Sequence, residues 1–83
     1  MVIMHLNIMT GALHLQAKNQ VYRIIEVGGN DVIVERLLEM GFAPGEEVRV
    51  VSQMMFAGPM ITEIQGATVA LRLEEAACIQ VLL

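Results

Sequence analysis

The chain has few of the residues on which most catalytic and nucleic-acid-binding sites depend. Its 83 residues include no tryptophan, one tyrosine, two phenylalanines and one cysteine. A single cysteine allows no disulfide within the chain, which is typical of a reducing compartment. Three scattered aromatic side chains give no platform on which nucleic-acid bases could stack. We therefore expect a cytoplasmic protein that does not bind nucleic acid.

Positive charge and long apolar runs are also scarce. Five Lys and Arg residues against nine Asp and Glu give a formal net charge of −4. The basic residues are spread between Lys18 and Arg72, whereas neutralising phosphates requires clustered cations. No apolar run approaches the ~18–20 residues that cross a bilayer. His5, Asn7 and Thr10 also interrupt any signal-peptide core near the start. These features argue against direct membrane insertion.

Groups that could perform chemistry are few. His5 and His14 are the only histidines, and no ligand pair shows the spacing of a metal site. Cys78 lies between Ala77 and Ile79, which is typical of a small buried hydrophobe. The glycines at 28–29 lack the Lys-Ser/Thr of a phosphate loop. We expect no catalytic residues, no metal and no cofactor, although a metal site using His5, His14 and Cys78 stays open as an alternative.

Apolar residues, in contrast, are abundant. They make up 55% of the chain, with seven methionines. A chain of this length buries only about 60–65% of the surface that it exposes when unfolded. The surplus predicts an exposed apolar patch that meets a partner, while methionine filling an irregular core is the competing interpretation. The oligomeric state is left open, and a homo-oligomer such as a dimer is compatible with this surplus.

The pattern of β-branched runs and turns predicts a mainly β fold. A helix is expected over residues 32–40, capped by Asn30 or Asp31 and ended by Gly41. Pro44-Gly45 suits the centre of a type II turn. Short strands separated by glycine-marked turns favour a small, closed or nearly closed barrel of about five strands with this one inserted helix. The expected strands are residues 21–27, 46–55, 60–64, 68–72 and 79–83.

The chain is predicted to form one domain. We expect the folded unit to cover residues 13–83. Residues 1–12 then form an N-terminal extension, because Met9-Thr10 would make an alternative beginning. This extension is either flexible or adds a strand to an edge of the sheet.

Several short sequence motifs occur in the same order as in a known protein family. They are Leu38-Glu39-Met40-Gly41-Phe42, then Pro44-Gly45, then Gly58-Pro59-Met60, and finally Ala70-Leu71-Arg72. In this order and spacing, residues 13–82 resemble the FeoA family of bacterial ferrous-iron transport accessory proteins.

The resemblance implies a fold and a partner. The fold would be an SH3-like β-barrel with a helical insertion. The partner would be FeoB, the membrane transporter that carries a cytoplasmic GTPase domain and whose uptake the protein would modulate. The same fold also occurs in iron-dependent repressors, so a sensor or corepressor-like domain in transcriptional regulation is an alternative. No helix-turn-helix region precedes the domain here, which disfavours a free-standing repressor.

The partner-binding surface is predicted at two places that are rich in methionine and aromatic residues. Such side chains are over-represented at the centres of interfaces and adapt to irregular partners. The alternative is that Leu38 and Phe42 pack the helix onto the barrel. The first place is the corner between the helix and the next strand, and the second is the later crossover. The predicted contact residues are Leu38, Met40, Phe42, Pro44, Met54, Met55, Phe56, Pro59 and Met60.

Overall fold

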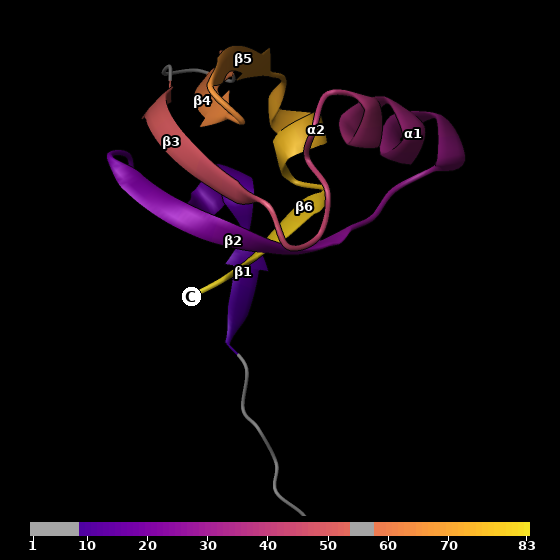
Figure 1. Cartoon of the computed structure of the whole chain (residues 1–83), viewed down its shortest axis with the longest axis horizontal. Coiled ribbons are helices and arrows are strands. Elements are labelled where there is room, and N and C mark those ends of the chain that lie inside the picture. Colours follow the sequence, from indigo (N-terminus) through magenta and orange to yellow (C-terminus); the bar gives the residue numbers. More distant parts are fainter. Residues whose placement is uncertain (1–8, 54–57) are drawn as a thin grey trace, which may run out of the picture.

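The computed structural model describes residues 9–53 and 58–83. One antiparallel sheet holds six strands in the order β1-β6-β2-β3-β4-β5 (Figure 1). The strands are β1 (Thr10–Ala12), β2 (Gln20–Val27), β3 (Glu47–Gln53), β4 (Met60–Ile64), β5 (Ala67–Leu71) and β6 (Ile79–Leu82). The helices are the 3₁₀ turn η1 (Leu13–Leu15), the inserted helix α1 (Asp31–Glu39) and the short α2 (Leu73–Ala76). The expected mainly β fold with one inserted helix is confirmed.

The long strand β2 serves both halves of the curved sheet. Its first half pairs with β3, and its second half pairs with β6. The register shifts between Ile24 and Glu26, and an irregularity of this kind bends a strand and increases its twist. A second shift lies in β3, between Val50 and Ser52. Among the described strands no ladder joins β1 to β5, so the barrel stays open along that seam.

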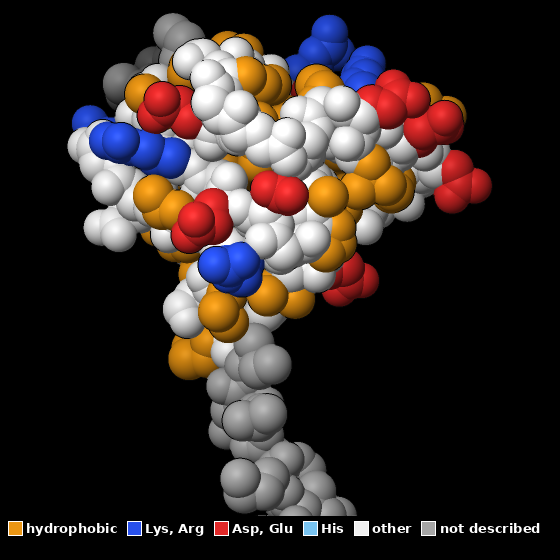
Figure 2. Space-filling model, in the orientation of Figure 1, with side chains coloured by type: hydrophobic (Ala, Val, Ile, Leu, Met, Phe, Trp, Pro, Cys, Tyr) orange, Lys and Arg blue, Asp and Glu red, His pale blue; other side chains and the backbone are white. Residues whose placement is uncertain are grey.

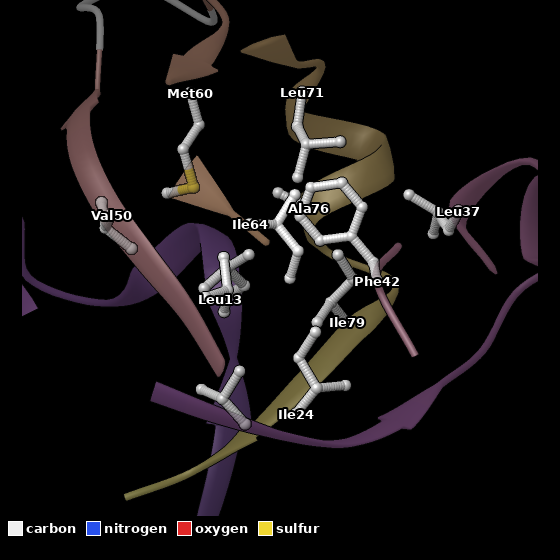
Figure 3. Packing of buried hydrophobic residues seen from close by; sticks show 12 residues of the cluster. Leu13, Ile24, Leu37, Phe42, Val50, Met60, Ile64, Leu71, Ala76 and Ile79 are labelled. Atoms are coloured by element: carbon white, nitrogen blue, oxygen red, sulfur yellow. The ribbon is translucent and has the colours of Figure 1, made fainter. Parts of the chain in front are cut away.

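The core fills the concave side of the sheet. Residues on β3 and β4 alternate, so that Val48 and Val50 are buried while Arg49 between them is exposed. Figure 3 shows Val50 of β3 in one cluster with Leu37 of α1, Ala76 of α2 and Leu13 of η1. The buried hydrophobic residues are Leu13, Ile24, Leu37, Phe42, Val48, Val50, Met60, Ile64, Leu71, Ala76, Ile79 and Val81.

Helix α1 is short, and both of its ends are specified locally. Asn30 is the N-cap, with its side-chain Oδ1 accepting a hydrogen bond from the Ile33 amide at 2.9 Å. At the other end Gly41 has a φ of +101°. The Phe42 amide donates to the Leu37 carbonyl at 2.9 Å and the Gly41 amide to the Leu38 carbonyl at 3.0 Å. These two bonds form a Schellman motif, which confirms the predicted stop at Gly41.

Candidate partner-binding surface

The first predicted place on the surface is the helix corner, which we define as residues 38–45. It runs from the last turn of α1 to the start of β3. Leu38 is 43% exposed. Pro44 is also exposed, and Met40 is half-buried. Acidic side chains gather over the α1 end of the molecule (Figure 2), and α1 itself carries Asp31, Glu35 and Glu39.

The helix corner is held by its own turn and by β2. The Glu46 amide donates to the Ala43 carbonyl at 3.1 Å. Gly45 has a φ of +92°, as the type II turn predicted at Pro44-Gly45 requires. The Gly45 amide then donates to the Ile24 carbonyl at 2.8 Å, and Arg23 Nη1 donates to the Gly45 carbonyl at 2.7 Å. A surface fixed in this way loses little conformational entropy when it binds a partner.

An ion pair ties α1 to α2. Arg36 Nη1 lies 3.1 Å from Glu75 Oε2. The Glu75 side chain is only 10% exposed, whereas that of Arg36 is 56% exposed. The other Glu75 oxygen, Oε1, accepts from the Arg72 amide at 3.0 Å and so caps α2. One carboxylate therefore fixes the start of α2 and the position of α1 relative to it.

We expect Glu75→Gln to lower the free energy of unfolding by about 1 kcal/mol, because the amide still accepts from Arg72 while the charge pairing with Arg36 is lost. Urea denaturation measures this change. Glu63→Gln is the matched control, since Glu63 pairs with Arg49 at 3.8 Å and both side chains are about half exposed. The control should change stability by less than about 0.5 kcal/mol. Equal effects of the two substitutions would contradict the special role of Glu75.

The structure corrects two of the predicted contact residues. Phe42 and Met60 have 0% relative exposure and belong to the core. Phe42 is buried because it follows Gly41 in the Schellman motif, where a hydrophobic residue packs against the last turn of the helix. Met60 is buried because it shares the inward face of β4 with Thr62 and Ile64. Neither side chain is available to a partner.

Of the second predicted place, the structure describes Pro59 and Met60, and Pro59 lies apart from the helix corner. An added side chain at Gly41 would lie 3.7 Å from Ile64 Cγ1, so the helix corner adjoins the end of β4. Pro59 is exposed but precedes Met60, at the start of β4. A strand of this length spans about 15 Å. Pro59 therefore lies about this distance from the helix corner, at the opposite end of β4. Met54, Met55 and Phe56 lie outside the described residues.

A second apolar patch, which the sequence analysis did not identify, surrounds β1 and the end of β6. We call it the β1–β6 patch. The Leu83 amide donates to the Met9 carbonyl at 2.9 Å, which brings the two segments together. Figure 2 shows apolar side chains gathered around β1. The sequence of residues 79–83 does predict a strand. It does not show which face of that strand is left exposed to solvent. The exposed apolar residues of these joined segments are Met9, Leu82 and Leu83.

The described residues offer little for catalysis or metal binding. No group of three His, Cys, Asp or Glu side chains gathers in residues 9–53 and 58–83. No pocket was found in the structure as described. Cys78 is half-buried, and its thiol donates to the Glu74 carbonyl at 3.3 Å. None of the helices described here has the length and apolar character that a membrane span requires.

These features define a small SH3-like β domain that carries a helix between its second and third strands and presents apolar surface on its exterior. The chain belongs to the FeoA domain family, whose sequence model matches residues 12–83. The predicted family is therefore confirmed. None of the curated proteins matches the chain.

Solved structures agree with this assignment. FeoA of Stenotrophomonas maltophilia, a prokaryotic SH3 domain protein solved with zinc, is 32% identical, has a TM-score of 0.73, and aligns over 88% of each chain. An iron uptake regulatory protein (FeoA) is 22% identical with a TM-score of 0.82, over 89% of this chain and 97% of that one. A manganese-dependent transcriptional repressor shares the fold at 19% identity, with a TM-score of 0.84, and the alignment spans 42% of its length.

Proposed function

We propose that this protein is an accessory protein of ferrous iron transport that binds the cytoplasmic GTPase region of a FeoB-type membrane transporter. The observation that carries the proposal is the FeoA domain over residues 12–83. The role in transport follows from the family. Binding to the transporter is the further step, and it places the protein in the cytoplasm, where that GTPase region lies.

The protein would act by binding one conformational state of the GTPase region more tightly than the other. A ligand shifts such an equilibrium only by its difference in affinity for the two states. A rigid docking element suits this task, because it loses little conformational entropy when it binds. The helix corner has this property, since backbone hydrogen bonds connect it to α1 and to β2.

We assign the docking role to Leu38, Met40 and Pro44 of the helix corner. Leu38 is the most exposed large side chain of these, and it lies on the last turn of α1 between Leu37 in the core and the acidic Glu39. The partner surface would be an apolar recess that receives Leu38, with basic groups at its rim. Basic groups are expected there because α1 carries acidic residues on its solvent-exposed side. Pro59 would make at most a separate contact at the far end of β4.

Leu38→Glu is expected to weaken binding to the transporter at least about tenfold, because a buried apolar contact at an interface centre contributes about 1.4 kcal/mol or more. Isothermal titration calorimetry with the purified cytoplasmic domain, with and without guanine nucleotide, measures the dissociation constant. Leu82→Glu is a matched control. It is the same substitution at a side chain that is 40% exposed, compared with 43% for Leu38, but it lies in the β1–β6 patch.

Two outcomes would contradict different parts of the proposal. If Leu82→Glu weakens binding and Leu38→Glu does not, the docking surface is the β1–β6 patch and the assignment to the helix corner is wrong. If the unmodified protein binds neither the soluble GTPase domain nor the full-length transporter, the proposed partner is wrong.

A further inference from the structure

Strand β5 is an edge strand without the usual protection. It lies at one end of the sheet, at the opposite end of the strand order from β1, and of the described strands it pairs with β4 alone (Figure 1). Natural edges are commonly blunted by charged residues, prolines or bulges. Residues 67–71 contain no charge and no proline, and the β4–β5 register is regular throughout. Ala67, Thr68 and Ala70 are exposed.

The other edge is shorter and partly closed. Strand β1 has only three residues. The Gln16 side chain folds back onto it, with Nε2 donating to the Ala12 carbonyl at 2.9 Å. The same amide group would lie 2.7 Å from a side chain added at Gly11. The two edges therefore differ, and within residues 9–53 and 58–83 only β5 offers an open ladder.

The backbone groups that β5 leaves free are identified by its pairing. The Thr62 hydroxyl donates to the Val69 carbonyl at 2.9 Å, so Val69 directs its backbone toward β4. Because backbone directions alternate along a strand, Thr68 and Ala70 direct their amides and carbonyls away from β4. The next outward amide, that of Arg72, is already taken by Glu75 Oε1. Among the described residues two donors and two acceptors, those of Thr68 and Ala70 on either side of Val69, thus have no partner on this edge.

We propose that β5 is a self-association edge, through which two copies of the protein pair antiparallel with Val69 opposite Val69 of the second copy. In this register Thr68 of each copy lies opposite Ala70 of the other. Each such pair exchanges both hydrogen bonds, so all four free donors and all four free acceptors of the two copies are used. The half-buried Val69 side chains meet on the core face, and the small Thr68 and Ala70 lie on the outer face.

A second copy fits this edge better than a charged peptide does. The strand carries no charge that would select an acidic or basic segment. In the proposed register the two copies are related by a two-fold axis at Val69, which is what an isologous contact between identical chains requires. The contact involves few residues and belongs with weak, transient interfaces, so a concentration-dependent equilibrium is expected.

Sedimentation equilibrium and amide hydrogen exchange on the purified full chain test this proposal without any transporter. At chain concentrations up to about 1 mM, where an association of about −4 kcal/mol is half complete, we expect a reversible dimer. Protection of the Thr68 and Ala70 amides should rise with concentration, while that of Val69, already bonded to β4, should not change. A monomer at every concentration, or protection that rises elsewhere instead, would overturn the proposal.

A pair of double variants tests the register. Thr68→Lys with Ala70→Lys places lysine opposite lysine twice, whereas Thr68→Lys with Ala70→Glu places lysine opposite glutamate twice. Like charges directly opposite destabilise a ladder and unlike charges stabilise it. We therefore expect the first variant to dimerise at least about tenfold more weakly than the second. Equal dimerisation of the two variants would overturn the proposal. So would protection that depends on adding another protein rather than on chain concentration.

Discussion

Replacing Phe42 with alanine is expected to lower the free energy of unfolding by about 3–5 kcal/mol, because the change leaves a cavity in a core that is closely packed. Phe42 is the largest fully buried side chain in the part of the chain that the structure describes, with 0% exposure. Figure 3 shows its ring pointing into the core cluster. For a domain of this size the melting temperature should fall by roughly 15–30 °C. Urea denaturation and thermal melting followed by circular dichroism measure the two quantities.

Two controls separate the anchoring role of Phe42 from a direct contact with a partner. Phe42→Leu keeps most of the volume and should cost much less stability than the alanine variant. Leu38→Ala removes an exposed side chain from the same helix corner and should change stability by less than about 1 kcal/mol. If Phe42→Ala melted like the unmodified protein, Phe42 would not be a core residue, and its assignment to the surface would return.

The helix and its neighbouring turn were predictable because their signals are local. Asn30 as a cap, Gly41 as a stop and Pro44-Gly45 as a turn each act through hydrogen bonds within a few residues. The structure has all three. The alternation of Val48 and Val50 with Arg49 is likewise visible in the sequence, and in the structure the two valines are buried and Arg49 is exposed.

The strand pairing was less accessible to sequence analysis. The two register shifts, in β2 and in β3, depend on how the sheet curves as a whole. For residues 1–12 the sequence left two alternatives open, and in the structure Thr10–Ala12 pair with β6 as strand β1. A strand of three residues that includes Gly11 is too short to show a period of two.

The errors in the candidate site came from reading residue types without their position. Phe42 is placed by its residue type among the contact residues, with packing onto the barrel as the alternative, and the alternative is correct because a hydrophobic residue directly after the stopping glycine packs back onto the helix. Met60 was grouped with the crossover before it, although Met60, Thr62 and Ile64 form an alternating set on one face of β4. Both signals were present locally. For the β1–β6 patch the sequence indicated only the strand at residues 79–83, and not its pairing with β1, because the two segments come from opposite ends of the chain.

Gly41→Val is the second substitution with a large expected effect. Gly41 has a φ of +101°, a conformation that β-branched residues adopt only under strain. We expect the variant to lose about 2–3 kcal/mol of stability, because strained residues of this kind cost about 1–3 kcal/mol and valine is among the least tolerant. Space is not the cause, since the nearest neighbour of an added Cβ is Gln65 at 3.5 Å, an ordinary contact. Thermal melting measures the loss.

A matched pair of alanine variants isolates the backbone conformation as the cause. Gly41→Ala should cost about 1–2 kcal/mol, because even the smallest side chain is disfavoured in the left-handed region. Gly28→Ala should be neutral or stabilising by up to about 1 kcal/mol, because its backbone is not left-handed and an added Cβ meets only the Cys78 carbonyl, at 3.9 Å. An unchanged melting temperature for Gly41→Val would show that Gly41 is not the helix stop. Without that stop the Schellman motif would no longer turn Phe42 into the core, and the rigidity that the docking role of the helix corner requires would have no structural basis.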